Sequence, residues 1–300
     1  MKIVFFGSSK YSTIVQKALN EKFGIVLCVT APDKPKGRQR KLTPTAVKEF
    51  ALKNKMDVIA PAKLDKTAIE NIAKLKPDFL AVCDYGLILS TDILKIPNYD
   101  ALNVHHSLLP KYRGPTPAPS AILAGEKKSG VTIISMSEDV DAGDILEQKD
   151  YSLRPDETTD SLLTVLNKLG AQLVIQVIEN YLSFKGDSLK GKRQDHTQAT
   201  YTHRLKKKDG EINLENPPDS ERLNRMMRAF HPWPGVWTKV KVKSGKSIII
   251  KFLPPHQIPN TRYQIPFVIQ PEGKKPMTVA EFKNGYPELF RQFEKLLSKN

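Results

Sequence analysis

Short apolar runs alternate with segments of helical periodicity over the first 190 residues of the chain. Apolar residues that recur every three or four positions predict an amphipathic helix, and short β-branched runs predict a buried strand. The predicted strands are residues 2–6, 25–30, 58–60, 79–82, 101–104 and 131–136, and the predicted helices are 11–19, 45–53, 68–75 and 158–182. This alternation is typical of a parallel sheet covered by helices, so we expect an α/β, Rossmann-like domain.

The pattern changes after residues 184–204, a polar stretch that we interpret as a linker. Beyond it, Ser220 is the predicted N-cap of a helix that ends at Ala229. Residues 235–243 alternate between apolar and polar positions, and residues 246–253 are rich in β-branched side chains. A Ser-Gly pair lies between the two segments, which predicts a hairpin. A further strand is predicted at residues 267–270, so we expect a small, mainly β, barrel-like domain of the oligonucleotide-binding (OB) type.

The length of 300 residues suits two domains. We place the first domain at 1–190, the linker at 191–205 and the second domain at 206–300. The net charge is +15, and residues 201–300 carry 19 Lys and Arg against 9 Asp and Glu. This excess favours a surface that faces a polyanion, although a lysine-rich surface can also serve solubility alone.

The chain shows no apparent run of about 18 apolar residues, so we expect no membrane span. Residues 1–7 predict a first strand, because a signal peptide needs a longer apolar region. Cys28 and Cys83 lie in apolar runs and are expected to be core residues in a reducing compartment. These features indicate a cytoplasmic protein. The six histidines show no spacing typical of metal ligands, so no metal is expected.

The densest group of chemically capable residues follows the strand 101–104. Asn103 and His105 are two positions apart at the end of that strand, so their side chains share a face and project where an open parallel sheet binds ligands. Asp141 lies in an acidic loop after the strand 131–136 and can return to His105 if the two strands are neighbours. Such a set suits acyl transfer. The amide can stabilise an oxyanion, the imidazole can exchange protons, and the carboxylate can orient the imidazole and raise its pKa.

The segment Asn-x-His-x-Ser-Leu-Leu-Pro from Asn103, with Asp-x-Gly from Asp141, resembles the folate-dependent formyltransferases. The resemblance implies a catalytic triad of Asn103, His105 and Asp141 and a formyl donor, 10-formyltetrahydrofolate. The folate-binding residues that it implies are Tyr85, Gly86, Leu87, Ile88, Ser107, Leu108, Leu109, Pro110, Asp139, Val140, Gly143 and Asp144.

Within this family, three further segments resemble the members that formylate methionyl-tRNA. Residues 31–42 resemble their basic insertion, residues 228–234 the start of their C-terminal domain, and residues 270–277 its last strand. The resemblance implies that the partner is initiator Met-tRNA and that Arg38, Arg40 and Lys41 contact it. We expect a monomer, because nothing in the sequence implies an oligomer.

Several positions depart from the family pattern. His106 stands where relatives usually carry a small residue or proline, and Asp84 is unusual before the Tyr-Gly pair. Residues 254–266 are too few for the barrel strands expected there, so the C-terminal domain looks abbreviated. Three alternatives remain open: a sugar-nucleotide N-formyltransferase with the same donor, a hydrolase that releases formate, and an RNA-binding protein that keeps the scaffold. The intact triad argues against the third.

Overall fold

The computed structural model of the chain describes residues 1–37, 39–183, 190–242, 245–254, 268–293 and 296. Its residues form two compact units, and neither unit is continuous in sequence. The first unit comprises residues 1–114, 128–152 and 163–202, and the second comprises 115–127, 153–162 and 203–300. The domain boundaries that we placed at 190 and 206 stay a prediction.

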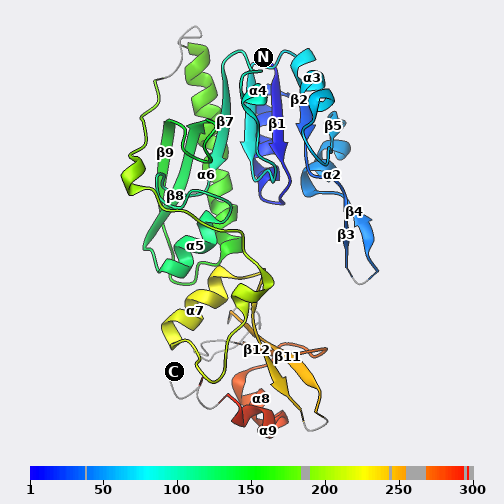
Figure 1. Cartoon of the computed structure of the whole chain (residues 1–300), viewed down its shortest axis with the longest axis vertical. Helices are drawn as coiled ribbons and strands as arrows, with labels where there is room; N and C mark the ends of the chain where they lie inside the picture. Colours follow the sequence, from blue (N-terminus) through cyan, green and yellow to red (C-terminus); the bar gives the residue numbers. More distant parts are fainter. Residues whose placement is uncertain (38, 184–189, 243–244, 255–267, 294–295, 297–300) are drawn as a thin grey trace. The chain divides into compact units, whose positions relative to one another are not determined.

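A seven-stranded sheet forms the centre of the first unit, in the order β5-β2-β1-β6-β7-β8-β9 (Figure 1). Its strands are β1 (Ile3–Gly7), β2 (Ile25–Val29), β5 (Val58–Ile59), β6 (Phe79–Cys83), β7 (Asp100–His105), β8 (Lys128–Ser135) and β9 (Ile145–Ser152). The pairs among β5, β2, β1, β6 and β7 are parallel, as the alternating pattern predicts. β8 and β9 pair antiparallel, so the sheet is mixed.

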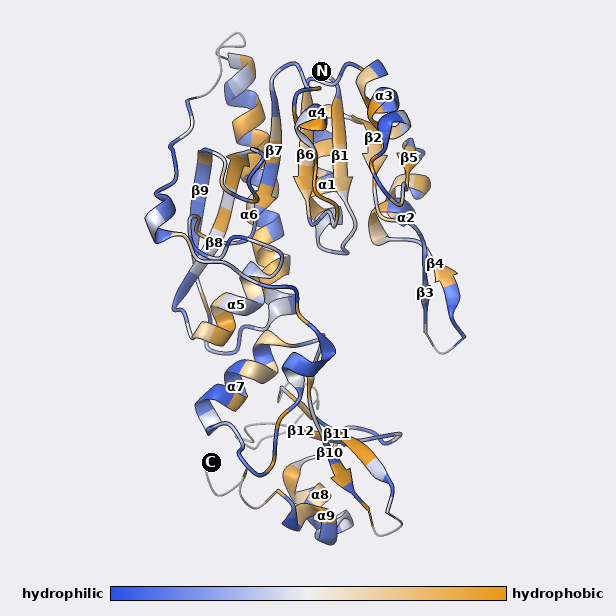
Figure 2. Cartoon of the chain, in the orientation of Figure 1, coloured by the Kyte–Doolittle hydropathy of each residue, from blue (hydrophilic) through white to orange (hydrophobic). Residues whose placement is uncertain are grey.

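The sheet is covered on both faces because its central strands are apolar throughout (Figure 2). Alternate residues of β1 point to opposite faces: Ile3 and Phe5 belong to one apolar cluster, and Val4 and Phe6 belong to the other. The helices that contribute to these clusters are α1 (Ser12–Phe23), α2 (Ala46–Lys53) and α6 (Thr159–Ser183) on the first face, and α3 (Lys66–Lys74) and α4 (Thr91–Leu94) on the second.

Among the described residues, α6 is long and apolar enough to cross a membrane by length and composition, with a mean hydropathy of 1.5 over its most apolar stretch. The sequence pattern predicted this helix at 158–182 but not its capacity, by length and composition, to cross a membrane. Half of that stretch is buried inside the structure, and Val174, Val177 and Ile178 pack in the same apolar cluster as β1. α6 therefore serves as a core helix that covers the sheet.

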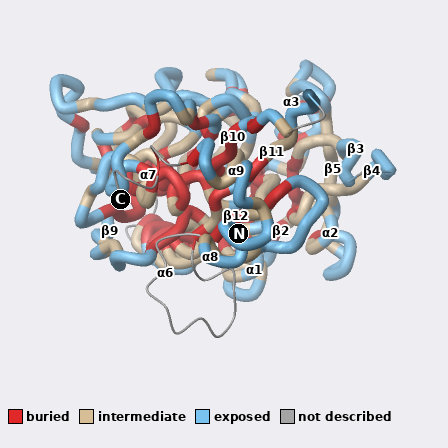
Figure 3. The backbone as a smooth tube through the Cα atoms, turned by 90° about the horizontal axis from the view of Figure 1, so that it is seen from below, coloured by how far each residue is buried: buried red, intermediate tan, exposed pale blue. Residues whose placement is uncertain are grey.

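The basic segment after β2 forms a short antiparallel hairpin, although no strand was predicted there from the sequence. Its strands are β3 (Lys34–Lys36) and β4 (Lys41–Thr43). The hairpin is exposed almost throughout and is drawn in pale blue at the edge of Figure 3. Leu42 is 65% exposed, so an apolar side chain accompanies the lysines on this hairpin.

Helix packing holds the discontinuous parts of the second unit together. α5 (Pro117–Ala124), which lies between β7 and β8 in the sequence, packs against α7 (Ser220–Ala229). The hydroxyl of Thr159 donates a hydrogen bond of 2.6 Å to the carbonyl of Ala229. The N-cap of α7 is Asp219, whose side chain accepts from the amide of Arg222, so the predicted cap at Ser220 is wrong by one residue.

The second unit ends in an antiparallel three-stranded sheet in the order β10-β11-β12. Its strands are β10 (Val236–Lys241), β11 (Ser247–Leu253) and β12 (Val268–Pro271), and the short helices α8 (Val279–Gly285) and α9 (Pro287–Arg291) follow them. Phe282 and Phe293 meet edge to face at 5.6 Å between ring centroids and form part of its core. The predicted β10–β11 hairpin is confirmed. Barrel closure stays a prediction, because residues 255–267 lie outside the described residues.

Candidate active site

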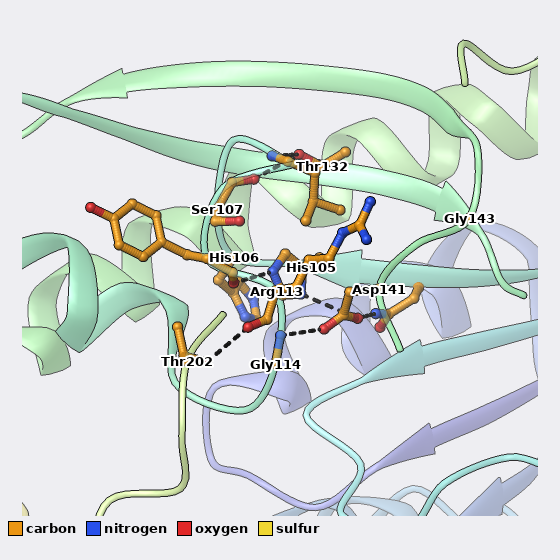
Figure 4. A network of polar contacts seen from close by, with 12 residues as sticks. His105, His106, Ser107, Arg113, Gly114, Thr132, Asp141, Gly143 and Thr202 are labelled. Carbon is orange, nitrogen blue, oxygen red and sulfur yellow. Dashed lines mark hydrogen bonds and ion pairs between the residues drawn. The ribbon is translucent and has the colours of Figure 1, made fainter. Parts of the chain in front are cut away.

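Asn103 and His105 lie at the carboxyl end of β7, two positions apart and on the same face. The loop between β8 and β9 returns Asp141 to both of them (Figure 4). The side-chain amide of Asn103 donates to Oδ1 of Asp141 at 3.1 Å, and Nδ1 of His105 lies 3.5 Å from the same oxygen. The structure thus brings together the three residues that the sequence singled out.

One further hydrogen bond fixes the carboxylate of Asp141. The backbone amide of Gly114 donates to Oδ2 at 2.7 Å, so each carboxylate oxygen has its own donor. Asp141 itself has φ of +53°, a left-handed conformation that an aspartate tolerates better than most residues. The carboxylate is therefore oriented before any ligand arrives, which is the arrangement that electrostatic catalysis needs.

His105 is 5% exposed, and its surroundings set its protonation. Nε2 lies 3.0 Å from the carbonyl of Tyr112, which can only accept, so Nε2 carries a hydrogen and Nδ1 faces Asp141. Burial lowers the pKa of His105, and the raising effects of Asp141 and of the Tyr112 carbonyl do not offset it. The net shift is opposite to the increase that we expected from Asp141, because the sequence does not reveal how deeply the imidazole is buried.

A buried arginine and glutamine, which the sequence reasoning missed, support the loop that carries Asp141. Arg113 is 2% exposed, and its Nε and Nη2 donate to Oε1 of Gln194 at 3.2 and 2.7 Å. Nε2 of Gln194 donates to the carbonyls of Asp141 and Gly143 at 2.8 and 2.7 Å. Residues 190–202 read as a linker in the sequence, which gave no signal for this contact.

Gly143 of the Asp-x-Gly sequence has a steric reason to be glycine. A Cβ atom at this position would lie 1.8 Å from the carbonyl oxygen of Ser135, which is backbone at the end of β8. The loop therefore crosses β8 more closely than any side chain allows. This close approach places Asp141 over β7.

The residues that the resemblance assigns to folate fall into three segments. Tyr85 follows β6 with its ring against Phe6 at 5.3 Å between centroids, and burial raises its pKa to about 12. Its hydroxyl has no hydrogen-bond partner among the described residues. Beyond it, Gly86 is exposed, Leu87 is half-buried, and Ile88 is 80% exposed.

The second segment, Ser107–Pro110, is more deeply buried than is usual for residues that contact a ligand. Ser107 and Leu109 are 1% and 4% exposed, while Leu108 and Pro110 are half-buried. The hydroxyl of Thr132 donates to the carbonyl of Ser107 at 2.6 Å. These two residues therefore have almost no surface available to a ligand in this structure.

The third segment is the loop that carries Asp141. Asp139 and Val140 are exposed there, Asp144 is half-buried, and Gly143 is buried against β8. The side chains with free surface on this loop thus lie on either side of the catalytic carboxylate. The assignment of all three segments to folate stays a prediction.

Two of the three residues predicted to contact tRNA lie on the β3–β4 hairpin. Arg40 and Lys41 are exposed, and Arg38 lies outside the described residues. Among the described residues, one group could hold a metal ion: Cys83, Asp84 and His106 offer ligand atoms within 4.8 Å of one another. Burial raises the pKa of Cys83 well above its usual value, and its thiol donates to Asn167, so a thiolate ligand is disfavoured there.

Comparisons with known proteins agree with this geometry. A formyl transferase profile matches residues 1–178, and a profile for the formyl transferase C-terminal domain matches residues 204–266. The chain is 35% identical to a methionyl-tRNA formyltransferase of Methylacidiphilum infernorum, over 95% of each chain. It is 43% identical to that of Chloroflexus aggregans, over 79% of this chain and 76% of the relative.

Among solved structures, a 4-N formyltransferase from Francisella tularensis is similar with a TM-score of 0.61 at 18% identity, over 83% of this chain and 95% of that one. HypX from Aquifex aeolicus, solved in complex with tetrahydrofolic acid, is similar with a TM-score of 0.59 at 19% identity, over 84% of this chain and 37% of that one. At these identities the likeness concerns the fold.

Proposed function

The chain belongs to the formyl transferase family, and we propose that it transfers the formyl group of 10-formyltetrahydrofolate to the α-amine of methionyl-tRNA. The observation that carries the proposal is the convergence at the end of β7 of Asn103 and His105 on Asp141, at hydrogen-bonding and ion-pair distance respectively. The relatives that cover most of the chain supply the acceptor, because they carry the name methionyl-tRNA formyltransferase.

The resting protonation of the triad suits attack by an amine. The neutral α-amine forms a bond to the formyl carbon, and the electron pair of the carbonyl moves to its oxygen. Neutral His105, whose pKa is lowered by burial, accepts the proton that the amine loses. Nδ1, which faces Asp141, then becomes part of an ion pair with that carboxylate. The bond from carbon to the folate nitrogen breaks, and that nitrogen takes the proton from His105.

Asn103 stabilises the charge that develops on the formyl oxygen. Its amide nitrogen carries two hydrogens, and Asp141 accepts one of them at 3.1 Å. The second serves the oxyanion, and loss of one such donor typically costs on the order of 10²–10³ in rate. Asp141 thus orients both of the other triad residues.

Charge on the hairpin and in the C-terminal hundred residues supports a tRNA acceptor. Arg40 and Lys41 are exposed beside the lysines of β3, and phosphates attract such a surface. The same surface has no evident use in binding a sugar nucleotide. We infer that the enzyme acts in the cytoplasm, where initiator tRNA is charged, and as a monomer.

The test offers the purified protein 10-formyltetrahydrofolate with either methionyl-tRNA or an amino-sugar nucleotide. Formylmethionyl-tRNA and tetrahydrofolate are the expected products, and the His105→Ala protein is the inactive control. Formylation of the sugar nucleotide alone would overturn the tRNA assignment. Release of formate at the same rate without any acceptor would show a hydrolase instead.

A further inference from the structure

His106, the residue after the catalytic imidazole, makes a second imidazole–carboxylate pair beside the triad. Its side chain is 4% exposed, and its Nδ1 lies 3.4 Å from Oδ1 of Asp84. Asp84 directly follows β6, which pairs with β7, so the pair bridges the ends of two neighbouring strands. The triad uses neither residue.

Asp84 is held in place from a third strand end. Its Oδ2 accepts a hydrogen bond of 2.6 Å from the hydroxyl of Ser9, which follows β1. Its φ of +51° is left-handed, a conformation that aspartate and asparagine tolerate but most residues avoid. The carboxylate therefore ties together the segments that follow β1, β6 and β7.

The charges of the pair act on His105. Burial raises the pKa of Asp84, but the positive charge of His106 and the hydrogen bonds from His106 and Ser9 outweigh it, so Asp84 is ionised. Protonated His106 lowers the pKa of His105, and Asp84 raises it, in addition to burial and Asp141. Among the described residues, Cys83 is a further titratable group close to His106, and Tyr85 follows Asp84 in the sequence.

Stability alone does not account for the pair. Nε2 of His106 is buried and has no hydrogen-bond partner among the described residues. A buried polar atom without a partner destabilises a fold, so such atoms call for another explanation. A metal ion is a poor one, because the thiol of Cys83 is protonated and donates to Asn167 at 3.2 Å.

We propose that His106 and Asp84 are positioning residues for formyl transfer: the pair fixes the backbone that carries His105 and places its charges beside that imidazole. His106 and Asp84 act in opposite directions on the same imidazole. The pair thereby sets the range of pH in which His105 is free to accept the amine proton. This inference rests on the proposed function in one respect only, that His105 is the base.

Two conservative variants separate the charges from the packing. In His106→Asn, the amide nitrogen replaces Nδ1, so the hydrogen bond to Asp84 can persist while the charge and the unpartnered nitrogen are removed. In Asp84→Asn, the amide oxygen can still accept from Ser9, and asparagine tolerates the left-handed backbone. Lys66→Gln is the matched control, since it removes one positive charge at a side chain that is 91% exposed.

The titration of His105 is measured by NMR of the ring in the intact protein without substrates, so the result does not depend on the acceptor. We expect His106→Asn to raise the midpoint and Asp84→Asn to lower it, each by on the order of one pH unit, with partial cancellation in the double variant. Lys66→Gln leaves the midpoint unchanged. An unaltered midpoint in both single variants, or a shift of the same sign in both, would overturn the proposal.

A kinetic measurement separates this inference from the proposed function. In the pH profile of kcat for methionyl-tRNA formylation, the acidic limb should move in the same direction as the NMR midpoint. A uniform loss of kcat with an unmoved limb would mean that the residues are merely structural. If the midpoints shift while no acceptor is formylated, the proposed function fails and the electrostatic coupling stands.

Discussion

Gln194 lies 53 residues beyond Asp141 in the sequence, yet its side-chain amide donates to the Asp141 carbonyl at 2.8 Å. The same nitrogen donates to Gly143, and the oxygen of Gln194 accepts twice from the buried Arg113. One neutral side chain therefore connects a buried charge to the loop of the catalytic carboxylate. Through this contact, the position of the catalytic Asp141 depends on residues 190–202.

Substitution of Gln194 should separate loop positioning from stability. Gln194→Ala leaves the Arg113 guanidinium without its main acceptor, so we expect a loss of about 2–3 kcal/mol in the free energy of unfolding, measured with urea. Gln194→Glu keeps an oxygen for Arg113 but loses the donor to Asp141 and Gly143. It should keep most of the stability and still lose kcat. Equal activity in wild type and Gln194→Glu would show that the contact between Gln194 and the loop does not contribute to catalysis.

The triad assignment predicts a specific kinetic pattern. His105→Ala and Asp141→Asn should each lower kcat by on the order of 10²-fold or more, because they act on proton transfer and developing charge. The dissociation constant for tetrahydrofolate should change far less. Steady-state kinetics and equilibrium binding check the two halves of the prediction. Near wild-type turnover in either variant would show that the assignment is wrong.

The buried imidazole predicts how activity and stability depend on pH. Because burial lowers the pKa of His105 from its usual value of 6.5, protonation of His105 should lower kcat only below pH 6.5, whereas kcat/KM also follows the α-amine of the acceptor, whose ordinary pKa is about 8. The unfolded chain takes up the proton at its ordinary pKa near 6.5, before the folded protein does, so His105 makes the free energy of unfolding decrease as pH falls from about 6.5. Urea titrations of wild type and His105→Asn across this range isolate that contribution.

Gly143 should tolerate no side chain. In Gly143→Ala, the new Cβ would meet the Ser135 carbonyl at 1.8 Å, so we expect a loss of about 1–3 kcal/mol and a lower kcat as the Asp141 loop moves away. Gly285→Ala is the matched control, because nothing lies within 4 Å of its Cβ. Thermal unfolding of both proteins tests the prediction, and similar melting temperatures would contradict it.

The basic hairpin predicts the salt dependence of tRNA binding. Replacing Arg38, Arg40 and Lys41 by glutamine should weaken methionyl-tRNA binding and reduce the log–log salt slope by roughly one unit per lost phosphate contact. The exposed Lys66→Gln protein controls for net charge. Binding isotherms at several salt concentrations supply the slope. A slope equal to that of wild type would place the hairpin outside the interface.

Local pattern was enough to predict much of this fold. The apolar runs of β1, β2 and β6 and the period of α6 are visible in the sequence because each is buried along most of its length. The strand β9 was missed because it lies at the sheet edge, where none of its residues is buried, and its residues follow no alternation. The hairpin β3–β4 was missed because lysines and a proline dominate it.

The triad residues of the site were predictable, because their positions follow from the two-residue period of a strand and from the pairing of neighbouring strands. Asn103 and His105 share a face by period two, and Asp141 returns from the next strand. Gln194 was not predictable, because polar residues in an irregular segment look like a linker until their long-range contacts are known. His106 and Asp84 were noticed separately as unusual residues, and only the pairing of β6 with β7 relates them.

The discontinuity of the second unit limits how this protein can vary. The chain passes from one unit to the other five times, and α5, near the middle of the sequence, packs on α7. Ala121 and Ile122 of α5 are 1% exposed, as is Leu223 of α7. A gene truncated or fused near residue 204 would separate these partners and leave an apolar helix uncovered. The two helices must therefore be inherited together, and the C-terminal surface can diversify by substitution but not by the exchange of a module.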